Sequence, residues 1–293
     1  MRNKLLFLIF FLHLYFSNAQ ATHDFMGVIK LNDSSLISYR ISLKEENGKV
    51  TGQSITNIGG DYESLALIKG VYDKDKKELS FQETETIYTK TPLDEDYEFC
   101  YINATIKGLV LGKSKSIKSN FTGLYSDKVR CAKGELILTS VSKIEERLER
   151  VEKKINKSKR IPDSIKQKIQ PLKLMDTLNM NILKKNQTLS VFTKSKQIKM
   201  TIFDGGKEDG DKITITSNGK TILNNFAATN NKKTLTIDLL ASKTTLAIKA
   251  NNEGSISPNT VVIEINDGEN NLKALSNLKL NETTRVDILK KPK

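Results

Sequence analysis

Four carboxylates in one short acidic run have the clearest chemical potential in the sequence. They are the candidate metal ligands Asp204, Glu208, Asp209 and Asp211. Carboxylates on a glycine-bearing loop are hard oxygen ligands of the kind that Ca²⁺ prefers. The run is not an EF-hand, because counting from Asp204 gives neither the glycine of position 6 nor the glutamate of position 12. Two interpretations stay open: calcium is a possible cofactor, or the carboxylates hydrogen-bond the turn backbone and fix the loop against Asn251 and Asn259.

Conventional catalytic residues are scarce. Once the N-terminal segment described below is removed, His23 is the only histidine, and neither G-x-S-x-G nor H-E-x-x-H occurs. Glu83 and Glu85 are the remaining candidates, because alternate residues of a strand share one face and lie about 7 Å apart. Paired carboxylates at such a separation can hydrolyse glycosides. Alternating Glu and Thr is more often a solvated face, so we expect no enzyme and rank a carboxylate-dependent hydrolase last.

Six tyrosines are candidates for sugar binding. The chain has no Trp, which is the usual stacking platform, but Tyr also combines an apolar ring with a hydroxyl group. The candidates are Tyr62, Tyr72, Tyr88, Tyr97, Tyr101 and Tyr125.

Cys100 and Cys131 are the two cysteines of a chain that we expect to be exported. Thiols oxidise and stay oxidised outside the cytoplasm, so this even pair predicts one disulfide bond. The closed loop of about 30 residues would stabilise the fold by roughly 3 to 4 kcal/mol. A redox role would require a C-x-x-C spacing, which is absent. The predicted bond is therefore structural.

Residues 1–19 have the pattern of a signal peptide. Positive charges at Arg2 and Lys4 precede the apolar run Leu5–Phe16, and small residues follow at Ser17 and Ala19. The run is too short to span a bilayer and no later segment is apolar enough, so we expect no transmembrane segment in the mature chain. Removing the peptide lowers the formal net charge from +13 to +11. We expect an exported protein of the periplasm, the cell surface or the extracellular space.

Residues 22–140 are predicted to form an antiparallel eight-stranded barrel or curved sheet. Eight short β-like runs are separated by turn residues such as Asn47-Gly48 and Gly59-Gly60. Three motifs here are Gly70-Val71-Tyr72, the run from Glu78 to Glu83, and Phe121-Thr122-Gly123. In these motifs the region is similar to small β-barrels of the avidin and lipocalin type, although it lacks the Trp that both families usually carry. The resemblance implies a ligand site inside the barrel.

Residues 141–183 are predicted to form a basic helical connector. Ile144, Leu148, Val151 and Ile155 follow the 4-3-4 spacing of an amphipathic helix, and Pro162 ends it. We expect the apolar stripe to lie against a neighbouring domain. A basic cluster in this connector would attract a polyanion such as an anionic lipid, lipopolysaccharide or an acidic glycan, although a merely solvated basic helix is the alternative. Nucleic acid is disfavoured, because no aromatic residues are interleaved for base stacking. The cluster comprises Lys153, Lys154, Lys157, Lys159, Arg160, Lys166 and Lys168.

Residues 184–293 are predicted to form a β-sandwich domain of nine short strands. Thr234 to Leu239 alternates polar and apolar residues, and Asn218-Gly219 is a hairpin turn. The segments Phe203–Asp211, Asn218–Lys220, Ala250–Gly254 and Ser257–Thr260 resemble, in order and spacing, a β-sandwich domain that recurs in exported proteins of Bacteroidota bacteria. The resemblance implies an exported accessory module without a defined chemistry.

The sequence therefore predicts an all-β, non-catalytic exported protein that works as a binding or scaffold module. Its expected partner is an envelope protein or a glycan. The alternative is a carrier that holds a small ligand or glycan inside the N-terminal barrel.

Overall fold

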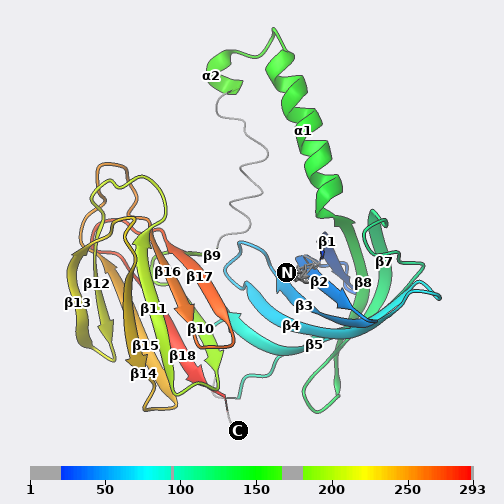
Figure 1. Ribbon diagram of the computed structural model, residues 1–293, viewed down its shortest axis with the longest axis horizontal. Helices are drawn as coiled ribbons and strands as arrows, with labels where there is room; N and C mark the ends of the chain where they lie inside the picture. Colours follow the sequence, from blue (N-terminus) through cyan, green and yellow to red (C-terminus); the bar gives the residue numbers. More distant parts are fainter. Residues whose placement is uncertain (1–20, 94–95, 167–180, 292–293) are drawn as a thin grey trace, which may run out of the picture.

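The computed structural model describes residues 21–93, 96–166 and 181–291. It is all-β, as predicted, with two β domains joined through a helical segment (Figure 1). The expected signal peptide and Lys168 lie outside the described residues. Among the described residues, no helix is long and apolar enough to cross a membrane.

The N-terminal domain is a closed antiparallel barrel, which confirms the barrel prediction. Each strand pairs with the next along the chain, and the pairing of the first strand with the eighth closes the ring. The strands are β1 (Thr22–Leu31), β2 (Leu36–Glu46), β3 (Lys49–Thr56), β4 (Ser64–Asp73), β5 (Glu78–Thr89), β6 (Tyr101–Lys107), β7 (Ser116–Leu124) and β8 (Arg130–Ser140).

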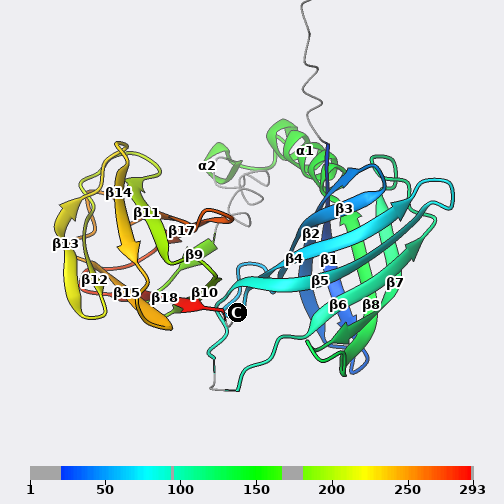
Figure 2. The ribbon, with the colours of Figure 1, turned by 60° about the horizontal axis from the view of Figure 1, so that its bottom comes forward.

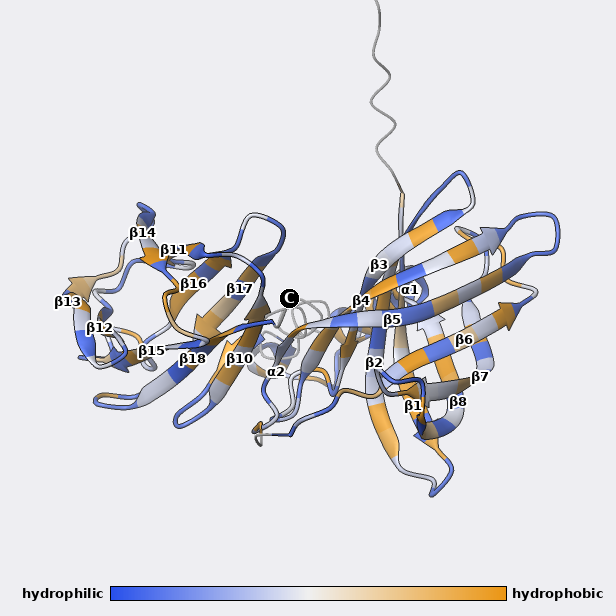
Figure 3. Cartoon of the chain, turned by 90° about the horizontal axis from the view of Figure 1, so that it is seen from below, coloured by the Kyte–Doolittle hydropathy of each residue, from blue (hydrophilic) through white to orange (hydrophobic). Residues whose placement is uncertain are grey.

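Alternating hydropathy drives these segments into strands, and Figure 3 shows the alternation of orange and blue along them. On β2, Tyr39, Ile41 and Leu43 are fully buried in the barrel core, while their neighbours along the strand remain partly exposed. At the closing seam, a Cβ on Gly27 of β1 would lie 2.1 Å from the carbonyl oxygen of Ile137 on β8. Glycine is required there because the two backbones approach too closely for a side chain.

β5 is the strand that joins the two domains. Its first residues pair with β6 as far as Gln82, and its last residues, Tyr88 and Thr89, pair with β10 (Thr188–Thr193). Figures 1 and 2 both show β5 reaching from the barrel toward β10. β5 therefore changes partners along its length and belongs to both domains.

The C-terminal domain is a sandwich of two sheets. One sheet has the order β13-β12-β15-β18-β10 and continues into β5, and the other has the order β14-β11-β16-β17-β9. Both sheets are mixed, because β10 pairs with β18 and β17 pairs with β9 in parallel. The remaining strands are β9 (Asn181–Leu183), β11 (Gln197–Asp204), β12 (Lys212–Ser217), β13 (Lys220–Ala227), β14 (Lys233–Asp238), β15 (Lys243–Ala250), β16 (Val261–Asn266), β17 (Asn271–Ser276) and β18 (Thr283–Lys290).

Two features of the connector differ from expectation. β9 lies within the segment that was expected to be helical, so the sandwich begins before residue 184. The helices are α1 (Val141–Lys157) and the single turn α2 (Asp163–Lys166). α1 projects away from the barrel (Figure 1), and Val141 is its one buried residue. Val151 is 46% exposed, so the predicted packing of the apolar stripe against a domain is not seen among the described residues.

Candidate functional site

A large cleft lies where the two domains meet. It has a volume of about 990 Å³ and is lined by the loop before β4, the segment after β5, and strands β10 and β18 with their flanking residues. Ligand sites occur preferentially at such domain junctions. The cleft is therefore the first candidate for binding.

Lys90, which lines the cleft, belongs to a buried ion pair. Lys90 Nζ lies 3.3 Å from Glu63 Oε1, and the two side chains are 1% and 4% exposed. Lys90 Nζ also donates a hydrogen bond of 3.1 Å to the carbonyl oxygen of Ile182 on β9. Glu63 accepts further hydrogen bonds from the Tyr88 hydroxyl at 3.0 Å and the Gly59 N–H at 2.5 Å. One charged group thus connects the barrel to the sandwich.

Burial has an electrostatic consequence at this pair. Removal from water lowers the pKa of the Lys90 ammonium, and the Glu63 carboxylate opposes that shift. Because a buried charge without a partner is costly, the pair ties the position of β9 to the end of β5. The ion pair therefore fixes the side of the cleft where β9 meets the end of β5.

Two exposed tyrosines stand at the cleft. Tyr62 is 62% exposed and Tyr97 is 40% exposed. The Tyr97 ring packs against two other aromatic rings, with its centroid 5.8 Å from that of Phe192 and 5.5 Å from that of Phe99. Both tyrosines belong to the six that were predicted as sugar contacts, whereas Tyr72 and Tyr88 are buried.

The charged groups around the cleft are already paired. Lys184 lies 3.9 Å from Asp61, Lys243 lies 2.6 Å from Asp287, and Lys185 contacts Glu282 at 3.4 Å. Amide and hydroxyl groups of Asn186, Gln187, Thr188 and Ser190 line the same space. The cleft therefore offers rings, amides and hydroxyls more than net charge.

The barrel interior contains a second polar group, the carboxylate of Glu83. Oε1 accepts hydrogen bonds from the Tyr39 hydroxyl at 2.8 Å and the Ser54 hydroxyl at 2.5 Å. Oε2 accepts from the Ile102 N–H at 2.8 Å. Since β5 and β6 stop pairing after Gln82, the Glu83 carboxylate takes the place of a main-chain acceptor of β5 for the Ile102 N–H of β6. Burial raises the pKa of Glu83, and the three donors oppose the shift.

The predicted sharing of one face by Glu83 and Glu85 is wrong. β5 has bulges, so Glu83 pairs with Ile68 while Glu85 pairs with Leu67. Because adjacent residues of β4 point to opposite faces, their two partners do as well. Glu83 is buried in the barrel, and Glu85 is outside, in contact with Lys291 and with Lys194.

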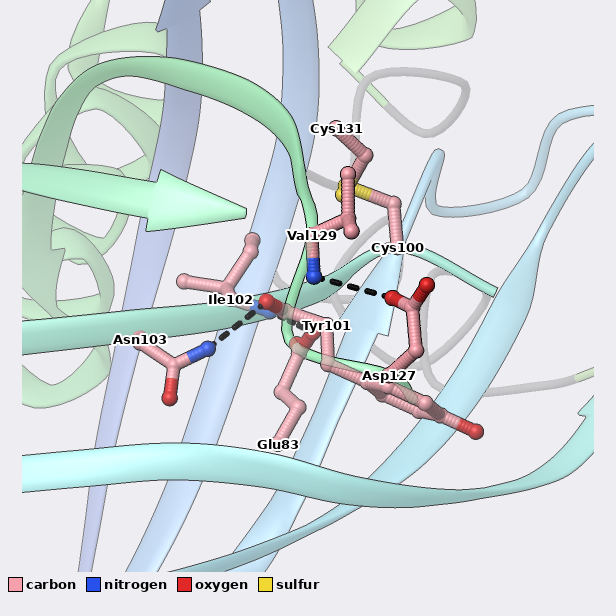
Figure 4. The surroundings of a disulfide bond; sticks show 8 residues. All are labelled: Glu83, Cys100, Tyr101, Ile102, Asn103, Asp127, Val129 and Cys131. Atoms are coloured by element: carbon pink, nitrogen blue, oxygen red, sulfur yellow. Dashed lines mark hydrogen bonds between the residues drawn. A yellow bond between two sulfur atoms is a disulfide. The ribbon is translucent and has the colours of Figure 1, made fainter. Parts of the chain in front are cut away.

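The predicted disulfide bond between Cys100 and Cys131 is confirmed. It joins the residue before β6 to β8 and passes beside β7 at Gly123, where a Cβ would lie 2.5 Å from Cys100 Sγ. Figure 4 shows its surroundings, with the Asp127 carboxylate accepting a hydrogen bond of 2.8 Å from the Val129 N–H in the neighbouring turn. The bond fixes this end of the barrel.

The structure separates Glu208 from the other three predicted metal ligands. Asp204, Asp209 and Asp211 lie near one another, and burial together with the Asp209 and Asp204 charges raises the pKa of Asp211 to about 6. Glu208 is exposed and accepts a hydrogen bond from the Asn230 N–H at 2.5 Å. Within the described chain, no three His, Cys, Asp or Glu side chains are arranged to hold a metal ion by themselves. Asn259, fully buried beside Asp211, was not predicted as a ligand.

The described members of the predicted polyanion-binding cluster lie at the outer end of α1, in the segment that follows it and in α2. Lys153, Lys154, Lys157, Lys159 and Arg160 are exposed. Two of the predicted lysines form local ion pairs, Lys153 with Glu149 at 3.6 Å and Lys166 with Asp163 at 2.8 Å. The polyanion site stays a prediction.

Comparisons of the chain with protein-family models, with curated proteins and with solved structures give no match. The resemblances to avidin-like and lipocalin-like barrels and to a Bacteroidota β-sandwich therefore stay predictions. The function has to be argued from the geometry of the sites described above.

Proposed function

We propose that this chain is a non-catalytic, exported binding protein that recognises an oligosaccharide in the cleft between its two domains. The observation that carries the proposal is that two exposed rings, Tyr62 and Tyr97, line the same cleft of about 990 Å³. Cavities of this size are in the range of natural ligand sites.

The chemistry of the cleft fits a sugar. A pyranose ring has an apolar face that packs on an aromatic ring, and its rim of hydroxyls needs planar donors and acceptors. Asn186 supplies an amide, and Thr188 and Ser190 supply hydroxyls. The Gln187 amide is already engaged, because its Oε1 accepts from the Lys184 N–H at 3.1 Å and its Nε2 donates to Asp61 Oδ1 at 3.5 Å. The lysines of the cleft are balanced by Asp61, Asp287 and Glu282, so the proposed ligand does not need to be strongly anionic.

Rigidity of the walls supports the same conclusion. Tyr97 packs on Phe99 and Phe192, and the Glu63–Lys90 pair holds β9 to the barrel. A preformed site avoids the entropic cost of ordering side chains when the ligand binds.

A carrier function inside the barrel is less well supported. The interior is filled by a continuous cluster of large side chains, among them Phe25, Tyr39, Leu79, Phe81 and Phe121. The Glu83 carboxylate is occupied by three donors. These contacts favour the cleft over the barrel interior as the binding site.

The test is binding of the mature, oxidised protein to a printed array of bacterial, plant and animal oligosaccharides. The variants Tyr62→Ala and Tyr97→Ala should each weaken binding about tenfold, which corresponds to a ring contact of about 1.4 kcal/mol. Tyr125→Ala is the matched control, since Tyr125 lies in the turn after β7 and does not line the cleft. It should bind as the unmodified protein does.

Three results would overturn the proposal. One is that no array component binds. Another is that Tyr125→Ala weakens binding as much as the two cleft variants do. The third is shortening of the bound oligosaccharide during overnight incubation, as read by mass spectrometry, since cleavage would contradict a non-catalytic function.

A further inference from the structure

Four side-chain oxygens in the sandwich domain are buried and unused. Among the residues that the structure describes, Asp204 Oδ2, Asp209 Oδ1, Asp211 Oδ1 and Asn259 Oδ1 have no hydrogen-bond partner. Asp211 and Asn259 are 0% exposed, and Asp204 is 4% exposed. A buried acceptor without a partner costs on the order of 1 to 3 kcal/mol, and more if it is charged, so a group of them requires an explanation.

Each of the four side chains has one terminal atom fixed by the main chain and the other left unused. Asp204 Oδ1 accepts from the Gly206 N–H at 2.8 Å, and Asp209 Oδ2 accepts from the Ile256 N–H at 3.1 Å. Asp211 Oδ2 accepts from the Thr260 N–H at 2.6 Å. These bonds fix the orientation of the carboxylates before any ligand arrives.

Asn259 is oriented in the same way. Its Nδ2 donates to the carbonyl oxygens of Lys212 at 3.2 Å and Asn252 at 3.1 Å, which leaves Oδ1 as the unused acceptor. Lys212 directly follows Asp211, and the Thr260 N–H that follows Asn259 binds the Asp211 carboxylate. The amide oxygen therefore belongs to the same buried corner as the carboxylate.

The donor set selects the kind of ligand. All four unused atoms are oxygens, three of them from carboxylates, so a cation would satisfy them and offset the repulsion among the three aspartates. Nitrogen and sulfur ligands, which transition metals prefer, are absent from this set. Ca²⁺ commonly combines carboxylate, amide and main-chain carbonyl oxygens in a site of six to eight ligands. Three acidic side chains are not sufficient here by themselves, which makes the Asn259 oxygen and nearby carbonyl groups necessary.

We propose that Asp204, Asp209, Asp211 and Asn259 bind one Ca²⁺ ion. The ion joins the loop between β11 and β12 to the segment between β15 and β16. Glu208, the fourth acid of the run, takes no part, because its carboxylate is exposed and bound to the Asn230 N–H.

The test uses the full mature protein, stripped with chelator and titrated with CaCl₂ by calorimetry, with native mass spectrometry alongside. One Ca²⁺ per chain should bind, visible as an added mass of about 40 Da that EDTA removes. The thermal midpoint of the unmodified protein should rise with Ca²⁺ concentration, because the ion binds only the folded form. MgCl₂ at equal concentration should bind more weakly, since Mg²⁺ requires a stricter octahedral geometry.

Two isosteric variants locate the ion. Asp209→Asn and Asp211→Asn each remove one negative charge without changing side-chain size, and each should weaken Ca²⁺ binding at least about tenfold. Glu208→Gln is the matched control within the same loop and should bind as the unmodified protein does. If Asp211→Asn does not fold, Asp209→Asn and the calcium-dependent thermal shift of the unmodified protein still decide the matter.

The proposal is overturned if no heat and no added mass are observed, or if Mg²⁺ binds as tightly as Ca²⁺. It is also overturned if Glu208→Gln weakens binding as much as the two aspartate variants, because that would indicate diffuse attraction by the acidic loop.

Discussion

Replacing Lys90 by Met should destabilise the junction between the domains more than any surface charge does. The substitution removes the cation 3.3 Å from Glu63 Oε1 and the hydrogen bond from Nζ to the Ile182 carbonyl. Glu63 would keep its hydrogen bonds from Tyr88 and Gly59 but would remain a buried carboxylate without a counter-charge. Breaking a buried pair in this way costs about 3 to 5 kcal/mol.

The size of the direct interaction follows from its distance. Two unit charges 3.3 Å apart attract by about 5 kcal/mol at an effective dielectric constant of about 20. Part of that attraction offsets the desolvation of both groups. A coupling energy of roughly 2 to 4 kcal/mol should therefore remain.

A double-mutant cycle measures this coupling. The four proteins are the unmodified chain, Lys90→Met, Glu63→Gln and the double variant, each unfolded by urea at pH 7 and followed by circular dichroism with the disulfide intact. In Glu63→Gln, the new amide would still offer one oxygen to the Tyr88 hydroxyl or the Gly59 N–H. The double variant should therefore be less destabilised than the sum of the two single variants.

Lys76→Met is the matched control, because Lys76 pairs with Asp73 at 3.1 Å but is 76% exposed. Its cost should stay below about 0.5 kcal/mol, as for other solvated pairs. If the cycle at Glu63 and Lys90 is additive within about 0.5 kcal/mol, the pair is not coupled, and the argument that it holds the junction is refuted.

Two further predictions concern the barrel. Replacing both Cys100 and Cys131 by Ser should lower the free energy of unfolding by roughly 3 to 4 kcal/mol in urea titrations, and an unchanged value would contradict a structural role for the bond. Burial raises the pKa of Glu83 above its usual 4.5, so the folded protein holds this proton more tightly than the unfolded chain does. The stability that Glu83 contributes is therefore fully present below about pH 4.5 and falls as pH rises through the raised pKa. Measured by thermal unfolding from pH 4 to 8, the stability advantage of the unmodified protein over Glu83→Gln should shrink with rising pH, and a widening gap would show that the carboxylate is stabilised as an anion.

Local patterns account for the part of the fold that the sequence predicts. Thr234 to Leu239 alternates in sequence and forms most of β14, because side chains two residues apart share one face. Asn218 and Gly219 both adopt positive φ, at 47° and 82°, as the predicted hairpin turn requires. These features depend on neighbours in sequence, so a single sequence carries enough information.

The missed features depend on partners far away in sequence. β9 is only three residues long and is a strand because it pairs with β17, which lies about ninety residues further along. The bulges that place Glu85 on the opposite face from Glu83 arise where β5 pairs with β4. No residue type in this part of the sequence predicts them.

The candidate sites were partly predicted for the same reason. Asp204, Asp209 and Asp211 are close in sequence, and each has one buried carboxylate oxygen without a hydrogen-bond partner, whereas Glu208 of the same run is exposed and accepts from the Asn230 N–H; sequence proximity alone does not say which side chains turn inward. Asn259 lies 48 residues after Asp211, so only the fold shows that its buried amide oxygen lies in the same part of the domain. The cleft likewise exists only once β9 and β10 meet the end of β5.

The pairing of β5 with β10 has a consequence for aggregation. β10 is covered on one side by β18, while on the other side its main chain meets Tyr88 and Thr89 of β5. A sandwich domain cut away from the barrel would present β10 as a bare edge bearing the apolar residues Leu189, Val191 and Phe192. Such an edge is a template for strands of other chains. The barrel thus protects the β10 edge of the sandwich from pairing with other chains. If the sandwich were transferred to another protein, a new strand or loop would have to cover β10 to prevent self-association.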